Sequence, residues 1–186
     1  MRQNNLEAAQ TAFENILAVQ DDREYLALVK IAILAALRKQ QELMALHWLA
    51  ACKKRLKTAF EKAELAADVA HLLESWCFAC CDKRLENVRV ALTDLVRQWF
   101  RAVKFSADAQ SLELELLNMS ARMVRRGWRS EARWLLHIVG WHALRYKSQS
   151  QWQRLLANLS LHFTVYARWE SFPKACEAYH ELVLLL

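Results

Sequence analysis

The chain has 186 residues and a formal net charge of +6; 55% of the residues are hydrophobic and 25% are charged. This composition excludes an intrinsically disordered protein and suffices for one folded domain with a sizeable core. Only two glycines and one proline are present, and because turns and strand edges consume both residue types, a β-rich fold is excluded as well.

Apolar residues recurring at i, i+3, i+4 and i+7 predict about nine helices. In chain order, we place them near residues 5–19, 22–39, 41–60, 62–81, 85–103, 107–126, 129–146, 150–168 and 172–186. The breaks carry polar residues that suit helix ends. Asp21 and Ser106 can accept from the first N–H groups of the next helix, and Gly127 suits a left-handed C-cap. The chain is therefore predicted to be all-α with short connections.

The odd-numbered helices of this series share a pair of residues, small or branched first and larger three positions later. The pairs are Ala45/Trp48, Val88/Ala91, Ala132/Leu135 and Cys176/Tyr179, at steps of 43, 44 and 44 residues, and Gln10/Phe13 lies 35 residues upstream. Only the Ala91 pair lacks the large partner. A fixed period of two helices is typical of an α-solenoid. A compact helical bundle, in which the repeat is a coincidence, is the alternative.

Phe172-x-x-Ala175-Cys176-x-x-Tyr179 resembles the first-helix signature of tetratricopeptide repeats. Looser copies are Trp128-x-x-Glu131-Ala132-x-x-Leu135 and Leu6-x-x-Ala9-Gln10-x-x-Phe13. The period is longer than the 34 residues of that family and the motif's terminal proline is missing, so HEAT-like arrays stay an alternative. The resemblance implies one domain over residues 1–186, a right-handed α-α superhelix that is TPR-like or HEAT-like. Its units would span about 5–40, 41–84, 85–127, 128–171 and, in part, 172–186.

In the tetratricopeptide family, the first helix of each repeat lines a concave groove that binds partners. The resemblance carries this stripe onto Arg89, Thr93, Arg97 and Arg101 of the fifth helix and Arg129, Arg133, His137, Trp141 and Arg145 of the seventh. Residues 97–147 hold 10 basic and 4 acidic residues, whereas the rest of the chain is balanced. Arginine binds oxyanions in a bidentate fashion and stacks on flat rings, so an anionic partner is expected. A solvated basic face without a partner is the alternative.

Two further basic runs lie at helix ends. Lys53, Lys54, Arg55 and Lys57 close the third helix, and Arg122, Arg125, Arg126 and Arg129 span the end of the sixth and the start of the seventh. Cations near a helix C-terminus are favoured by the helix dipole without any ligand. We interpret both runs mainly as residues that stabilise helix ends, and only secondarily as part of a binding surface.

Cys77-x-x-Cys80-Cys81 is the strongest candidate for metal or redox chemistry. A reactive thiolate needs a helix N-terminus, whereas this motif lies in the last turn of a predicted helix. A zinc site needs four ligands, and no second pair at metal-ligand spacing is present. The cysteines are therefore interpreted as small core residues, and neither a metal site nor a cofactor is predicted.

No catalytic motif is complete either. His180-Glu181 begins like a zinc-protease motif, but Leu184 stands where the second histidine would be. Glu113 and Glu115 are paired in sequence, yet i, i+2 spacing places them on different helix faces. We therefore expect no enzyme activity.

The leading hypothesis is a non-enzymatic scaffold or adaptor that binds an acidic protein segment in a concave basic groove. Nucleic-acid binding is the alternative, because helical repeats can hold a phosphate backbone on a basic face. Five cysteines inside helical patterns, with neither a signal peptide nor a membrane span, predict a cytoplasmic protein without a membrane partner. The apolar end, Leu184–Leu186, is a candidate surface for a homodimer.

Overall fold

The computed structural model describes residues 2–103 and 106–146. The chain divides into two compact units at residues 103 and 104, and each is described by itself. Of the described residues 89% are helical and none is in a strand, which confirms the all-α class. No described helix combines the length and the apolar character that crossing a membrane requires. The helices predicted near 150–168 and 172–186 lie outside the described residues.

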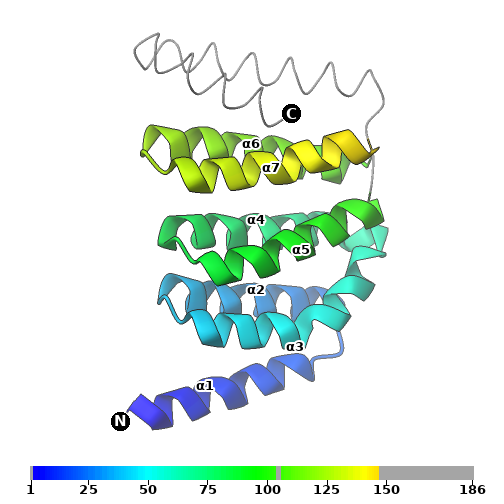
Figure 1. The fold of residues 1–186 in the computed structure, drawn as a ribbon. Helices are drawn as coiled ribbons and strands as arrows, with labels where there is room; N and C mark the ends of the chain where they lie inside the picture. Colours follow the sequence, from blue (N-terminus) through cyan, green and yellow to red (C-terminus); the bar gives the residue numbers. More distant parts are fainter. Residues whose placement is uncertain (1, 104–105, 147–186) are drawn as a thin grey trace. The chain divides into compact units, whose positions relative to one another are not determined.

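The seven earlier helices form within a few residues of their predicted positions (Figure 1). The first unit holds α1 (Arg2–Leu17), α2 (Asp22–Arg38), α3 (Glu42–Phe60), α4 (Ala66–Lys83) and α5 (Glu86–Val103), with a short 3-10 helix at Ala63–Leu65. The second unit holds α6 (Ala107–Arg125) and α7 (Arg129–Tyr146). Asp21 and Ser106 cap α2 and α6 as expected: Glu24 N donates to Asp21 Oδ1 at 2.8 Å, and Ala109 N donates to Ser106 Oγ at 3.1 Å.

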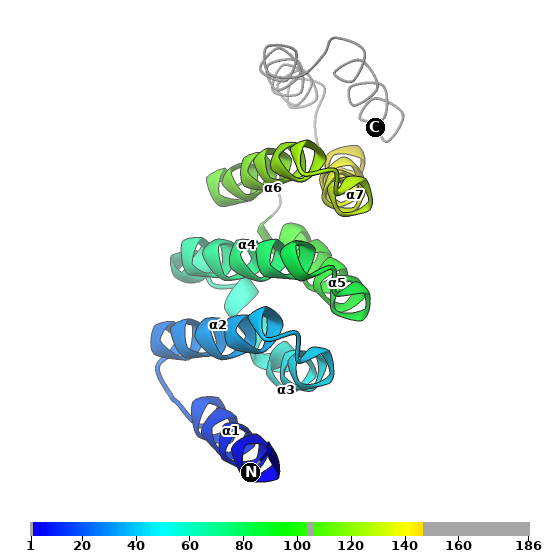
Figure 2. The same cartoon turned by 90° about the vertical axis from the view of Figure 1, so that its left-hand side faces the viewer.

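The first unit is built from two stacked hairpins. Helix α2 packs against α3 and α4 against α5, while α2 also packs on α4 and α3 on α5. Figure 2 shows the result as two layers, one of α2 and α4 and one of α3 and α5. Trp76 is fully buried between the hairpins, and its Nε1 donates to the Lys30 carbonyl at 3.2 Å. Helices α3 and α5 therefore run parallel and side by side (Figure 1).

The α2–α3, α4–α5 and α6–α7 connections share one turn geometry. Gln40, Arg84 and Gly127 all have positive φ, at 57°, 55° and 75°. In each turn the N–H of the next residue donates to the carbonyl five residues earlier, from Gln41 to Ala36 (2.9 Å), Leu85 to Cys80 (3.1 Å) and Trp128 to Met123 (2.9 Å). This is the Schellman arrangement of a helix C-terminus. The positions are 44 and 43 residues apart, so the spacing read from the helices recurs in the backbone, and the expected cap at Gly127 is confirmed.

Helix α1 is held against α3 by residues of two of the repeated pairs, Gln10/Phe13 on α1 and Ala45/Trp48 on α3. The rings of Phe13 and Trp48 stack with centroids 4.5 Å apart and an interplanar angle of 6°. Trp48 Nε1 donates to Gln10 Oε1 at 3.0 Å. Both rings are buried. Positions that correspond in sequence therefore meet in space at this contact.

Candidate functional site

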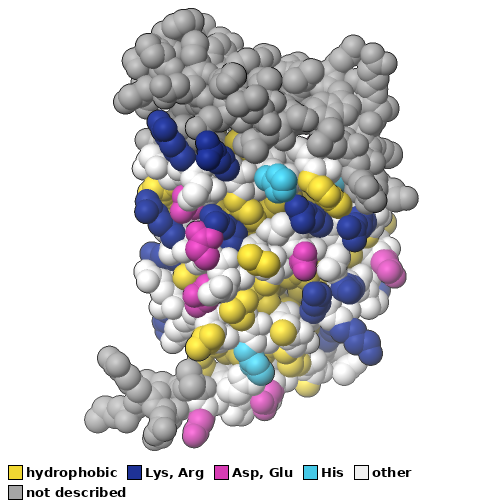
Figure 3. Space-filling view, viewed as in Figure 1, with side chains coloured by type: hydrophobic (Ala, Val, Ile, Leu, Met, Phe, Trp, Pro, Cys, Tyr) yellow, Lys and Arg dark blue, Asp and Glu magenta, His cyan; other side chains and the backbone are white. Residues whose placement is uncertain are grey.

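The carboxyl-terminal halves of α3 and α5 carry the basic side chains that we name the α3–α5 basic cluster: Lys53, Lys54, Lys57, Arg97 and Arg101. On α3, the core side is occupied by residues such as Cys52 and Leu56, so the lysines lie away from the core. Lys54, Lys57 and Arg101 are exposed, whereas Lys53 and Arg97 are half-buried. Figure 3 shows Lys and Arg side chains gathered over the right-hand ends of α3 and α5.

The register between the two helices is set at their amino-terminal ends. Glu42 Oε1 accepts from Asn87 N at 3.0 Å. Because α3 and α5 run parallel, this contact places Lys53 within about one residue of the level of Arg97, and Lys57 within about one residue of the level of Arg101. The same pairs follow from the 44-residue step of the repeat. Side chains from two helices thus form one surface.

The lysines of this surface carry no partner from the described acidic residues near them in sequence. Asp94 on α5 and Glu61 after α3 are exposed carboxylates. Lys53, Lys54 and Lys57 form no ion pair with any described side chain. The cluster can therefore bind an anion without first breaking a lysine ion pair.

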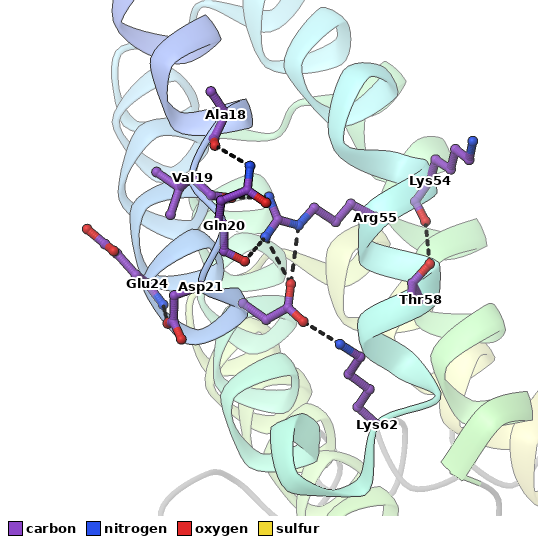
Figure 4. A network of polar contacts seen from close by, with 10 residues as sticks. Ala18, Val19, Gln20, Asp21, Glu24, Lys54, Arg55, Thr58 and Lys62 are labelled. Carbon is purple, nitrogen blue, oxygen red and sulfur yellow. Dashed lines mark hydrogen bonds and ion pairs between the residues drawn. The ribbon is translucent and has the colours of Figure 1, made fainter.

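Arg55 belongs to the same run of basic residues but points to the other side of α3 (Figure 4). Its guanidinium donates to the carbonyls of Val19 and Gln20 and to Asp22 Oδ1, the latter two at 2.9 Å from Nη2. It also lies 3.9 Å from the centroid of the Tyr25 ring. Arg55 therefore joins α3 to the α1–α2 connection and is not available to a partner.

Asp22 at the start of α2 completes this network. Lys62 Nζ contacts Asp22 Oδ2 at 2.5 Å, while Arg55 holds Oδ1. The hydrogen bonds from Lys62 and then Arg55 lower the pKa of Asp22 below its ordinary value of 3.8. The bond to Asp22 raises the pKa of Lys62 above 10.5. The expectation that the basic run at the end of α3 serves mainly as capping is therefore wrong for Arg55, which makes a tertiary connection.

The stripe predicted on α5 is only partly open to solvent. Arg89 forms an ion pair with Glu86, and its side chain is 18% exposed. Thr93 Oγ1 donates to the Arg89 carbonyl at 2.7 Å. Arg97 is half-buried and Arg101 is exposed in the last turn. Of these four residues, Arg101 is therefore the best placed to meet a partner.

The stripe predicted on α7 lies in the second unit. Arg129, Arg133 and His137 are exposed at i, i+4 and i+8, and Trp141 is half-buried one turn later. Arg145 falls within α7, but its side chain is outside the described residues. Since the two units are described separately, a continuous stripe across α5 and α7 stays a prediction.

The second unit contains a buried polar contact that the sequence analysis missed. His142 Nδ1 on α7 contacts Glu113 Oε1 on α6, and the side chains are 1% and 6% exposed. Glu115 instead faces outward and pairs with Arg122 at 2.8 Å. The prediction that the two glutamates occupy different faces is confirmed. The sequence signal was the position of Glu113 between Leu112 and Leu116 on the apolar side of the helix.

The cysteines of α4 are deep in the first unit. Cys77, Cys80 and Cys81 are buried, and Cys80 Sγ donates to the Leu85 carbonyl at 3.2 Å. Burial raises the pKa of Cys80 to about 12 and the pKa of Cys77 well above 9.0. At neutral pH Cys77 and Cys80 are therefore thiols. Within residues 2–103 and 106–146, no three His, Cys, Asp or Glu side chains come together in a way that could hold a metal ion.

The lysines of α3 are the main surface feature that sequence reasoning assigned to another role. Adding one repeat step of 44 residues to Lys53 and Lys57 leads to Arg97 and Arg101, so the repeat itself contained the signal. The count of charges along the chain did not reveal this basic surface, because residues 1–96 are balanced overall.

No protein-family model, curated protein or solved structure matches this chain.

Proposed function

We propose that this protein is a cytoplasmic, non-enzymatic interaction module that binds an acidic protein segment on its odd-numbered helices. The α3–α5 basic cluster carries the proposal, because it presents basic side chains from two helices and its three lysines form no ion pair with a described side chain. Cys52, Cys77 and Cys80 are buried in the core of the first unit, and unpaired core thiols would suit a reducing compartment. Exposed lysines keep much of their hydration, so binding would be driven by charge and would weaken with salt.

The proposed architecture is a right-handed solenoid of about nine helices, TPR-like or HEAT-like, that extends the pattern of the first unit. The common turn at Gln40, Arg84 and Gly127 supports it, since equal turns at equal steps are what a helical repeat requires. In such an array Arg133 and Trp141 of α7 would occupy positions equivalent to Arg89 and Arg97. The binding surface would then continue along the array.

A charge-reversal experiment tests this function. Lys57→Glu combined with Arg101→Glu places two reversed charges in the cluster, while Arg38→Glu combined with Lys39→Glu is the matched control. All four residues are exposed and lie at helix C-terminal ends, so the helix dipole disfavours both variants alike. The probe is a fluorescein-labelled peptide of Asp and Glu residues, followed by fluorescence anisotropy across a range of NaCl concentrations.

We expect the cluster variant to bind the acidic peptide about tenfold more weakly than the parent and the control to bind within about twofold of it. The log–log slope against salt should be about one or two for the peptide. A single-stranded DNA probe separates the alternative: tighter binding than the peptide, with a slope of several units, would identify a nucleic-acid-binding protein. Equal loss in both variants would remove the cluster from the binding surface.

A further inference from the structure

The amino-terminal end of α3 borders a groove whose charge is opposite to that of the cluster. The groove has a volume of about 740 Å³ and lies between α1, the α2–α3 turn and the first turns of α3. Its described lining consists of Glu7, Gln10, Gln40, Gln41, Glu42, Leu43, Met44 and His47. Helices α1 and α3 run parallel and separate toward the N-terminus of α1 (Figure 1). The groove lies where they separate, beyond the Phe13–Trp48 contact.

A highly exposed apolar side chain lies in the lining of this groove. Leu43 is 84% exposed, more than any other large hydrophobic residue among those described. Met44 beside it is half-buried, and a methionine side chain adapts to differently shaped apolar partners. Covering both residues would remove apolar surface from water, which favours binding of an apolar group.

The charged residues of the lining are both acidic. Neither Glu7 nor Glu42 forms an ion pair with a described side chain. The Glu42 carboxylate is held in place at the groove because its Oε1 accepts from Asn87 N at 3.0 Å. No lysine or arginine occurs in the described lining, although the chain as a whole carries a charge of +6. The local field therefore favours a cationic ligand.

We propose that this groove binds a basic amphipathic helix from a partner protein. Its apolar side chains would cover Leu43 and Met44, while flanking Lys or Arg side chains would reach Glu7 and Glu42. A helix suits the site because two diverging helices leave a trough into which a third can be laid by its apolar face. This site is independent of the acidic partner proposed for the α3–α5 basic cluster.

Two labelled helical peptides test the proposal by fluorescence anisotropy. The first combines an apolar Leu stripe with Lys flanks, and the second has every Lys replaced by Glu. We expect the parent protein to bind the Leu/Lys peptide and to bind the Leu/Glu peptide at least about tenfold more weakly. Leu43→Ser should weaken Leu/Lys binding about tenfold, since it removes most of the apolar contact. Val90→Ser is the control, because Val90 is 70% exposed on α5 and lies outside the groove.

Glu7→Lys provides a second, independent variant at an exposed position. It should weaken binding of the Leu/Lys peptide and strengthen binding of the Leu/Glu peptide. Circular dichroism should show parental helicity in all three variants. Equal affinities for the two peptides, unchanged binding in Leu43→Ser, or equal losses in Leu43→Ser and Val90→Ser would each overturn the proposal. So would the absence of Leu/Lys binding at millimolar protein concentration.

Discussion

At the scale of single residues, Arg55 differs most from its neighbours in sequence. Lys53, Lys54 and Lys57 lie on the outer side of α3, whereas Arg55 turns toward the α1–α2 connection. Only a planar guanidinium can serve two carbonyls and a carboxylate while stacking on Tyr25. Its contribution is therefore structural.

Arg55→Ala should lower the free energy of unfolding by about 2 to 3 kcal/mol, because it leaves a half-buried carboxylate and two carbonyls without this donor. Urea denaturation followed by circular dichroism measures the loss. Lys54→Ala, at the adjacent exposed position, should change stability by less than about 0.5 kcal/mol. Equal effects of the two substitutions would show that the Arg55 network does not stabilise the fold.

The Asp22 contacts predict a loss of stability in acid. Lys62 and Arg55 hold the folded-state pKa of Asp22 below its ordinary value of 3.8. The unfolded chain therefore binds a proton first as the pH falls. This stabilisation is fully present above the ordinary value and is lost as the pH falls through the lowered one. Lys62, whose pKa is raised, stays protonated throughout the acid range.

We expect the free energy of unfolding to fall between neutral pH and about pH 3 more steeply in the parent than in Asp22→Asn, which cannot titrate at this position. Urea titrations at a series of pH values measure both slopes. Parallel pH profiles would indicate that Asp22 has the same pKa in the folded and unfolded chains.

At the scale of elements, the hairpin turns explain how the chain forms helical connections with two glycines. Gln40 and Arg84 adopt the left-handed conformation that glycine adopts at Gly127. This conformation is unfavourable for residues with a Cβ atom. The helix packing on both sides of each turn must therefore compensate for a local backbone cost.

Gln40→Gly should stabilise the protein by about 0.5 kcal/mol. Glycine removes the strain of the left-handed conformation, and the greater conformational entropy of glycine in the unfolded chain offsets part of this gain. Gly127→Ala should destabilise it by about 1 kcal/mol. No atom lies within 4 Å of a Cβ built at Gly127, so the effect would come from the backbone alone. Thermal or urea denaturation gives both values.

Lys39→Gly is the control for Gln40→Gly. Lys39 precedes Gln40 and has a φ of −83°, so glycine offers it no conformational relief. This substitution should be neutral or destabilising. A stabilisation equal to that of Gln40→Gly would mean that the positive φ at Gln40 carries no cost.

At the scale of the whole molecule, the first unit contains a core of its own. The side chains of Val29, Ile33, Leu72 and Leu73 are fully buried, and the two hairpins that carry them pack on each other. Helix α1 is tied to this core by Phe13 and by the Arg55 network. These contacts are all internal to residues 1–103.

A fragment of residues 1–103 should therefore fold alone, with helical circular dichroism and one cooperative urea transition. Its apparent affinity for the acidic peptide should be close to that of the full chain if the α3–α5 basic cluster is the main contact. A fragment that is helical but unfolds without a cooperative transition would show that the first unit depends on the rest of the chain.

The sequence by itself determined the all-α class, the bounds of the described helices to within a few residues, and the caps at Asp21, Ser106 and Gly127. These depend on local preferences and on apolar spacing within one helix, which neighbouring residues reveal. The repeat step also placed Phe13 and Trp48 at corresponding positions. The architecture beyond the first unit and the binding stripe remain predictions.

Only the tertiary structure decided which surfaces exist. The α3–α5 basic cluster joins Lys53 and Lys57 to Arg101 across more than 40 residues of sequence, and a charge count along the chain cannot show which helices lie side by side. The direction of Arg55, the groove at Leu43 and the burial of Glu113 against His142 depend likewise on the neighbour that each helix side meets. Helical periodicity assigns a residue to one side of its own helix, whereas packing between helices decides whether that side is covered by a neighbour or left open to a partner.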